Sequence, residues 1–214
     1  TYAVRVSAGT AQLWSAPVGV NVELSVPVVN PLQPLTQVRV EGEPLVISGS
    51  VSGQGTLSYK WRKDGIEVAG AATPTLTLSS ATLANAGEYV LEATNEAGSA
   101  SSAPARVNVL GITSQPAGLS LAYGGSGALV VGATAGTAPV AYQWTRNGQP
   151  LAGGTSAEYA LANVTLANTG TYAVRLSAGT AQLWSAPVVV NVGLSVPVVN
   201  PLQPLTQVRA EGEP

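Results

Sequence analysis

Cysteine and histidine are both absent from the 214-residue chain. Without thiols no disulfide can form, so small domains must be held together by packing alone. Without imidazole the chain lacks the commonest general base and the commonest metal ligand. These absences argue against an enzyme, and we expect no catalytic residue, no metal site and no cofactor.

Charged side chains are scarce as well. Asp, Glu, Lys and Arg make up 9% of the residues, whereas roughly 25% is usual for soluble domains. Nine scattered basic residues and a net charge of −2 argue against a nucleic-acid partner or an anionic membrane surface. Low net charge brings little self-repulsion, which is compatible with dense assembly and equally with a neutral secreted protein.

The chain also has no apolar run of the roughly 18 residues that a membrane span needs, so we expect no membrane insertion in this segment. What it has in abundance is Val, Thr and Ser, together with 24 Gly and 15 Pro. This composition is typical of many short strands joined by tight turns. It predicts an all-β protein.

The sequence repeats itself at two spacings. In the longer repeat, residues 171–214 match residues 1–44. The two copies differ at four pairs of positions, Val6/Leu176, Gly19/Val189, Glu23/Gly193 and Val40/Ala210. The shorter and weaker repeat aligns YKWRKDG, which begins at Tyr59, with YQWTRNG, which begins at Tyr142. Two diverged domains therefore form one unit, and that unit then starts again.

Four motifs recur in both domains: Tyr-x-Trp-x-x-(Asp/Asn)-Gly, Leu-x-Leu, Leu-Ala-Asn-x-Gly-x-Tyr and Ala-Pro-x-x-Val-x-Val. Together they resemble the bacterial immunoglobulin-like domains of the I-set type found in large repetitive surface proteins. The resemblance covers nearly the whole chain. It implies tandem immunoglobulin-like β-sandwiches, here cysteine-free, with strands A to G in two packed sheets. It also implies an extracellular or cell-surface location.

Two aromatic positions mark the expected core of each domain. Trp61 and Trp144 stand at the strand C position, where an indole fills the space between the sheets, and a strong turn dipeptide follows each. Tyr89 and Tyr172 match the tyrosine corner, whose hydroxyl ties the loop before strand F to the backbone.

The resemblance also implies where disulfide-bearing relatives carry their cysteines. These positions match Gly49 and Leu91 in the first domain and Gly132 and Val174 in the second. A glycine is therefore expected to face an aliphatic residue, and Leu91 and Val174 are expected in the core. The missing disulfide leaves the two tryptophans a larger share of the core packing.

The longer repeat, placed on the sandwich, sets the expected domain boundaries. They are strands F and G of a preceding domain over 1–23, a linker and complete domain over 24–110, a second complete domain over 111–193, and a linker with the next strand A over 194–214. A two-stranded hairpin is marginal in water by itself. We therefore expect a longer polypeptide of many units; an artificially shortened chain is the alternative.

The two domain junctions differ. LGITS joins the complete domains, whereas ELSVPVVNPL is about twice as long and is stiffened by two prolines. One hypothesis is that the longer stretch, ELSVPVVNPL, is an assembly strand that docks on the sheet edge of a neighbouring domain. The favoured alternative is a spacer packed along its own first strand. The residues of the docking hypothesis are Val26, Pro27, Val28, Val29 and Pro31.

A tryptophan stands at the start of strand G in both copies of the longer repeat. Trp14 and Trp184 lie in the repeated AQLWSAP, where the first complete domain has Ser101. Such a side chain could contact a protein or stack on a sugar ring. The favoured alternative is packing against the end of its own sandwich or against the next linker.

The sequence therefore predicts a structural repeat unit of a long extracellular fibre, stalk or filament, whose partners are copies of itself. The alternative is an adhesin, a module array on the cell surface that binds a glycan or a protein.

Overall fold

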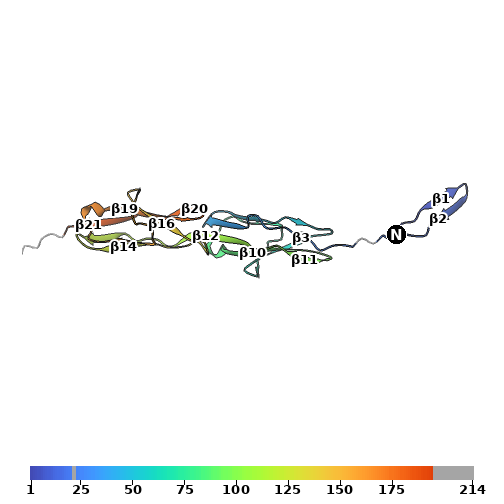
Figure 1. Ribbon diagram of the computed structural model, residues 1–214, viewed down its shortest axis with the longest axis horizontal. Helices are drawn as coiled ribbons and strands as arrows, with labels where there is room; N and C mark the ends of the chain where they lie inside the picture. Colours follow the sequence, from blue (N-terminus) through green and yellow to red (C-terminus); the bar gives the residue numbers. More distant parts are fainter. Residues whose placement is uncertain (21–22, 195–214) are drawn as a thin grey trace, which may run out of the picture. The chain divides into compact units, whose positions relative to one another are not determined.

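The structure is a computed structural model that describes residues 1–20 and 23–194 (Figure 1). Apart from two short 3-10 helices, η1 (Leu83–Asn85) and η2 (Leu166–Asn168), the regular elements of these residues are strands. The described chain divides into two compact units, one of residues 1–20, 23–113, 133–141 and 176–183 and one of residues 114–132, 142–175 and 184–194. The predicted fold class, all-β with two cysteine-free immunoglobulin-like sandwiches in tandem, is confirmed.

The first sandwich has a larger and a smaller layer of strands. The larger layer runs in the order β8 (Ile66–Glu67), β7 (Ser58–Lys63), β10 (Gly87–Asn95), β12 (Ala105–Ser114) and β4 (Thr36–Val40), with β11 (Gly98–Ser101) also on β10 and β15 (Gly132–Thr134) also on β12. The smaller layer holds two pairs, β5 (Leu45–Ser48) with β9 (Thr75–Leu78) and β3 (Val28–Val29) with β6 (Val51–Ser52). β12 and β4 run parallel, whereas β10 is antiparallel to its neighbours.

The core of the first sandwich fills the space between these layers. Tyr89 and Leu91 alternate with less buried residues along β10, because successive side chains of a strand point to opposite faces. They form one cluster with Trp61 of β7 and Ile47 of β5, and none of the four is more than 1% exposed. Removing this apolar surface from water is the main favourable term in folding.

The second sandwich repeats the plan. Its larger layer runs β13 (Leu119–Ala122), β21 (Val188–Gly193), β19 (Gly170–Ala178), β16 (Ala141–Arg146) and β17 (Gln149–Pro150), with β20 (Ala181–Trp184) also on β19. Its smaller layer is the pair β14 (Gly127–Val130) and β18 (Glu158–Leu161). Trp144, Tyr172 and Val174 are buried in this sandwich as Trp61, Tyr89 and Leu91 are in the first.

The turn after each core tryptophan has the backbone that its dipeptide favours. Asp64 and Gly65 have φ values of 49° and 82°, and Asn147 and Gly148 have 49° and 79°. Two successive residues with positive φ make the hairpin turn whose twist matches the flanking strands, and Asn-Gly and Asp-Gly adopt it most readily. These turns connect β7 to β8 and β16 to β17.

Each buried tyrosine ties its strand to the 3-10 helix before it. The Tyr89 hydroxyl donates to the backbone oxygen of Asn85 at 2.9 Å, and the Tyr172 hydroxyl donates to that of Asn168 at 2.8 Å. Burial raises the pKa of the Tyr89 phenol above its usual value, and the nearby Asp64 charge adds to the shift. The phenol is thus a neutral donor in the folded chain.

Replacing Tyr89 with Phe is expected to destabilise the first sandwich by about 1 kcal/mol, because the Asn85 carbonyl loses its donor while the ring stays buried. Urea titration followed by hydrogen exchange of the β10 amides would measure the loss. Tyr59→Phe is the matched control in the same sandwich, since Tyr59 is only partly buried and its hydroxyl makes no hydrogen bond among the described residues. Equal effects of the two changes would contradict the role of the corner.

The strand pairing corrects one expectation, the match of Gly132 to Gly49. The Gly49 amide donates to the Pro74 oxygen, and the residue that donates to the equivalent Ala157 oxygen is Val131. Equivalent residues of the two domains are 83 positions apart at Tyr59 and Tyr142. At this strand they are 82 positions apart, from Gly49 to Val131. A slip of one residue moves a side chain to the other face, so buried Val131, and not Gly132, occupies the place of Gly49 in the second sandwich.

Residues 1–20 form a separate two-stranded sheet of β1 (Arg5–Ala8) and β2 (Ala11–Trp14), with register pairs from Arg5/Trp14 to Ala8/Ala11. An isolated bridge between Tyr2 and Val18 extends it. The longer repeat aligns this segment with β19 and β20 of the second sandwich, and its assignment to a preceding domain stays a prediction. The expected linker and strand A over 194–214 lie, except for Leu194, outside the described residues.

Candidate binding surfaces

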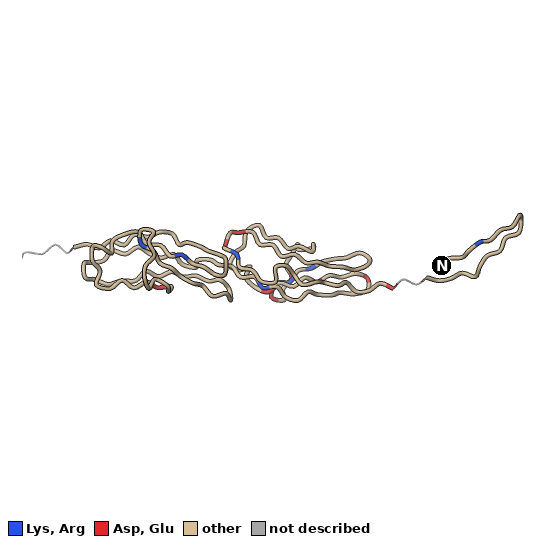
Figure 2. The backbone as a smooth tube through the Cα atoms, turned by 45° about the horizontal axis from the view of Figure 1, so that its top comes forward, with Lys and Arg blue, Asp and Glu red and all other residues tan. Residues whose placement is uncertain are grey.

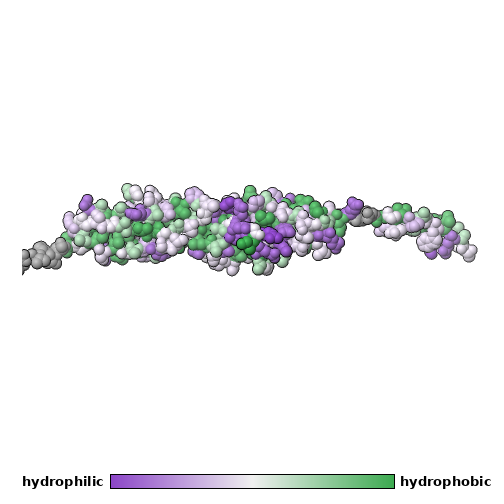
Figure 3. All heavy atoms as spheres, turned by 90° about the horizontal axis from the view of Figure 1, so that it is seen from below, coloured by the Kyte–Doolittle hydropathy of each residue, from purple (hydrophilic) through white to green (hydrophobic). Residues whose placement is uncertain are grey.

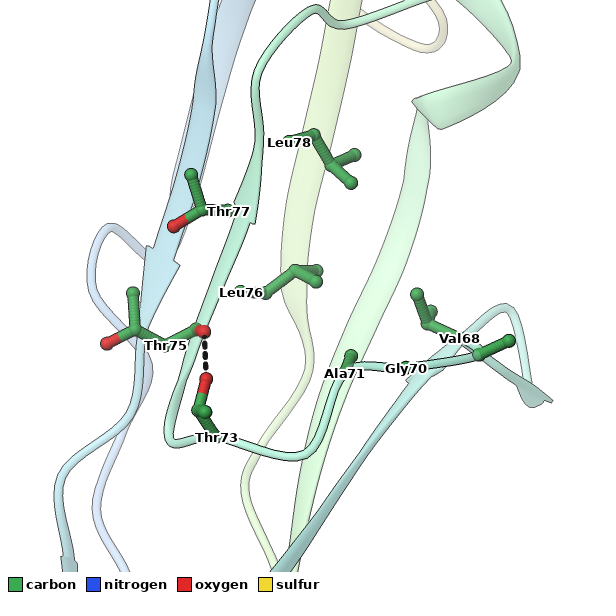
Figure 4. Close-up of a pocket in the computed structure, with 9 residues that line it drawn as sticks. Val68, Gly70, Ala71, Thr73, Thr75, Leu76, Thr77 and Leu78 are labelled. Carbon is green, nitrogen blue, oxygen red and sulfur yellow. Dashed lines mark hydrogen bonds between the residues drawn. The ribbon is translucent and has the colours of Figure 1, made fainter.

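An open groove lies at one edge of the first sandwich. The resemblance implies a strand D between strands C and E, but residues 68–74 contain no strand, and the chain passes directly from β8 to β9. β9 therefore pairs only with β5 and forms an edge of its layer. A cavity of about 310 Å³ lies there, lined by Val68, Ala69, Gly70, Ala71, Thr73, Thr75, Leu76, Thr77 and Leu78. Figure 4 shows most of these side chains.

The backbone of β9 explains what this edge offers. Along an antiparallel pair, residues whose backbone N–H and C=O groups face the partner strand alternate with residues whose groups face away. The hydrogen bond from the Gly49 amide to the Pro74 oxygen places Pro74 among those that face the partner. By that alternation Thr75 and Thr77 direct their backbone N–H and C=O groups away from β5. The Thr73 hydroxyl donates to the Thr75 oxygen at 2.7 Å (Figure 4), which satisfies one of these groups. The remaining groups suit an extended peptide better than a compact ligand.

The chemistry of the groove is limited to hydroxyl and backbone groups. No carboxylate, amine or imidazole lines it, so it has no general acid or base and no group that would activate its threonine hydroxyls. The second sandwich has Glu158 where the first has Thr75 at the start of this strand. A charge on an edge strand is a common device against unwanted pairing, and the first sandwich lacks it on β9.

The charged residues gather on the first sandwich (Figure 2). One group surrounds the β7–β8 turn, where Asp64 accepts from the Glu88 amide at 2.8 Å and from the Lys63 ammonium at 2.7 Å. These two donors hold the pKa of Asp64 below its usual value. Arg106 pairs with the Glu88 carboxylate. Every charge of this group has a partner, so the group stabilises the turn and offers no free ligand.

Trp184 ends β20 and remains 51% exposed although its sandwich is complete. Its copy Trp14 is 60% exposed, and the Arg5 guanidinium lies 5.6 Å from the centre of the Trp14 ring. Packing against the sandwich thus covers only part of the indole. Contact with a protein, with a glycan or with the linker beyond residue 194 stays a prediction.

The residues of the docking hypothesis lie mostly within the first sandwich. Val28 and Val29 pair with Ser52 and Val51 of the same sandwich, and Pro27 is buried. Val26 and Pro31 are exposed. Docking of this stretch on a neighbouring domain stays untested, and it would require the breaking of two backbone pairs that the sandwich already makes.

Among residues 1–20 and 23–194, no three Asp, Glu, His or Cys side chains are grouped as a metal ion would require. The same residues include no helix with the length and apolar character of a membrane crossing.

The sequence analysis did not predict the role of Ser102, whose hydroxyl links strands F and G. The Ser102 hydroxyl accepts from the Leu91 amide at 3.0 Å, and the Ser102 amide donates to the Leu91 oxygen at 2.8 Å. Ser185 holds Val174 in the same way. The shared Ser-Ala-Pro of all three copies is the signal that could have identified this position.

Comparison with known proteins agrees with this geometry. Residues 30–109 match the immunoglobulin I-set domain, and no curated protein matches the chain. A structure of three immunoglobulin domains of titin, an E-to-A mutated variant, is similar at 19% identity with a TM-score of 0.55, covering 81% of this chain and 67% of its own. The four N-terminal immunoglobulin domains of Dscam1 isoform 6.9 are similar at 17% identity with a TM-score of 0.52, covering 86% of this chain and 51% of their own.

These likenesses show the fold: tandem immunoglobulin-like domains, with an I-set domain in the first sandwich. Such domains are typically non-catalytic.

Proposed function

We propose that this chain is a structural repeat unit of a long extracellular fibre, stalk or filament of a bacterial surface protein, and that its partners are further copies of itself. The observation that carries the proposal is the repeat of residues 1–44 at 171–214 with four differences. Two domains, the second of which is followed by the start of the same unit, are the pattern of a tandem array.

The geometry of the two copies supports the proposal. The Tyr2–Val18 bridge of the first copy has its counterpart in the Tyr172–Val188 pair of the second. Both copies therefore have the backbone of strands F and G. A unit copied in tandem is expected to repeat structure as well as sequence.

The surface of the second sandwich suits contact between copies. Between residues 111 and 193 the only charged residues are Arg146, Glu158 and Arg175, whereas residues 24–110 carry twelve. Large apolar side chains are exposed on it as well, namely Tyr123, Val130, Leu166, Trp184 and Val189. Figure 3 shows strongly hydrophilic residues over part of the first sandwich and a paler or hydrophobic surface over most of the second. Such a surface favours association.

The half-exposed Trp184 favours a second candidate function, an adhesin array that presents this side chain to a glycan or a protein. Aromatic side chains dominate the energetic centres of interfaces and also cover sugar rings. The first candidate explains the repeat and the low charge, and the second explains only the tryptophan.

Electron microscopy of the native assembly is expected to show filaments with an axial repeat of two sandwiches. The intact polypeptide should be many times heavier than the 21.5 kDa of this segment. A discrete particle with the mass of this segment alone that binds glycans saturably would support the adhesin and contradict the fibre.

Trp184→Ser separates the two candidates, because the first sandwich already has Ser101 at the matching position. In a fibre held by its covalent chain the filaments persist in this variant. In an adhesin the glycan or protein binding is lost.

A further inference from the structure

Two strands occupy equivalent edge positions in the two sandwiches and differ in charge. Among the described residues β9 pairs only with β5, and β18 pairs only with β14. β18 begins with the exposed Glu158, whereas β9, Thr75–Leu78, carries no charge. A charge on an edge strand opposes pairing with another chain. The second sandwich therefore has this protection at its edge, and the first sandwich does not.

The outward backbone groups of β9 match those of a second copy of the same strand. The N–H and C=O groups of Thr75 and Thr77 face away from β5. If two β9 strands run antiparallel with Leu76 opposite Leu76, Thr75 of each chain lies opposite Thr77 of the other. Each such pair exchanges both N–H···O=C bonds. The Thr75 oxygen can accept this bond besides the one from the Thr73 hydroxyl, because a carbonyl oxygen has two lone pairs.

The side chains of β9 also suit pairing with a copy. In Figure 4 Leu76 and Leu78 point into the groove. Thr75 and Thr77 point to the other side of the strand, where they are exposed. The antiparallel pairing sets threonine opposite threonine on this side, and such pairs stabilise a sheet. No charge on β9 repels its copy.

We propose that β9 is a self-pairing edge, through which the first sandwiches of two chains join their smaller layers into one antiparallel sheet with a two-fold axis at Leu76. Such a contact uses the same surface of both chains. The proposal rests on the proposed function only in taking a further copy of the chain as the partner. One short strand pair is a small interface, so two single units associate weakly. An array of many units would strengthen the contact through multivalency.

The first test measures association of the full chain. Sedimentation equilibrium up to about 1 mM is expected to show a reversible rise from 21.5 kDa toward twice that mass. Amide exchange resolved by NMR should slow with concentration at Thr75 and Thr77. It should stay constant at Leu76 and Leu78, whose backbone groups face β5. A chain that remains monomeric, or slowing confined to other residues, would overturn the proposal.

A charge on β9 tests whether this edge makes the contact. Thr75→Glu copies Glu158, which the second sandwich already accepts at the equivalent position. It should weaken the dimer by about tenfold, because two carboxylates then lie diagonally across the strand pair. Ser120→Glu is the matched control, an equal charge on the exposed side of the edge strand β13, and should leave the dimer unchanged. Equal effects of the two variants would contradict pairing through β9.

Mixed variants test the register. Thr77→Lys should pair with the Thr75→Glu chain about threefold more tightly than Thr75→Lys does, because positions 75 and 77 lie directly opposite in the proposed pairing. The two copies of position 75 are only diagonal neighbours. The reverse preference would set Thr75 opposite Thr75 and overturn the pairing about Leu76.

The outcome is separable from that of the proposed function. A β9 dimer of a polypeptide that has only the mass of this segment would support the self-pairing edge and contradict the fibre. Filaments whose lateral contacts ignore Thr75→Glu would support the fibre and contradict the self-pairing edge.

Discussion

Replacing Trp61 with alanine is expected to destabilise the first sandwich by about 3–5 kcal/mol, the range for large buried aromatic residues. Trp61 is fully buried, in the same core cluster as Leu91 and Ile47. Its indole N–H also donates to the Thr73 oxygen at 2.9 Å. The substitution thus opens a cavity and leaves a carbonyl without its donor. With no disulfide in the chain, no covalent link between the layers limits the loss.

Hydrogen exchange across a urea series would measure this change, because it resolves the two sandwiches separately. The amides of β7 and β10 should lose protection while those of β16 and β19 keep it. Trp144→Ala should give the opposite pattern, since the Trp144 indole donates to the Ser156 oxygen at 2.9 Å in the second sandwich. Trp184→Ala is the exposed control and should cost less than about 1 kcal/mol. A Trp61→Ala chain as stable as this control would contradict the assignment of the core.

Introducing valine at Gly49 should have the second largest effect, a loss of about 1–3 kcal/mol or more from overpacking. Even a Cβ at this position would lie 2.2 Å from Leu91 Cδ2 and 3.2 Å from the Pro74 oxygen. Leu91 is fully buried, so any shift of its side chain away from a new Cβ disturbs the core around it. The strain therefore falls on the packing of β5 against β10.

The double substitution Gly49→Val with Leu91→Val reproduces the Val131 and Val174 pair of the second sandwich. It should recover at least half of the stability lost in Gly49→Val. Leu91→Val alone should cost about 0.5–1.5 kcal/mol, as for the loss of one buried methyl group. Urea unfolding of the four chains gives the coupling between the two positions. Losses that simply add would show that the two side chains do not share one space.

Several features of the fold could be predicted because they depend on short patterns. Asp64-Gly65 and Asn147-Gly148 favour positive φ at both residues, which only a tight hairpin turn uses. Trp61 and Trp144 stand just before these turns, at the position that a strand directs inward.

Other features could not be predicted because they depend on which backbones pair. The spacing of the shorter repeat holds through most of the second domain but is one shorter at strand B, and both Val131 and Gly132 are acceptable strand residues. The proline-rich stretch before the first sandwich suits a spacer, yet Val28 and Val29 are strand residues of the sandwich itself. Residue identity alone predicts neither the shorter offset at strand B nor the pairing of Val28 and Val29.

The candidate surfaces could also be predicted only in part. The repeated AQLWSAP identifies Trp184 as a candidate contact residue, but only the packed sandwich shows that half of the indole stays exposed. The groove beside β9 arises from a missing strand. The shortness of residues 68–74 was its only trace in the sequence.

By itself the sequence determined the class of the protein and its repeating plan, because these follow from composition and from the spacing of the repeated motifs. The tertiary structure decided the strand register and the open edge of β9. These depend on hydrogen-bond partners far apart in the chain, and strand pairing, unlike a turn, is not encoded by neighbouring residues.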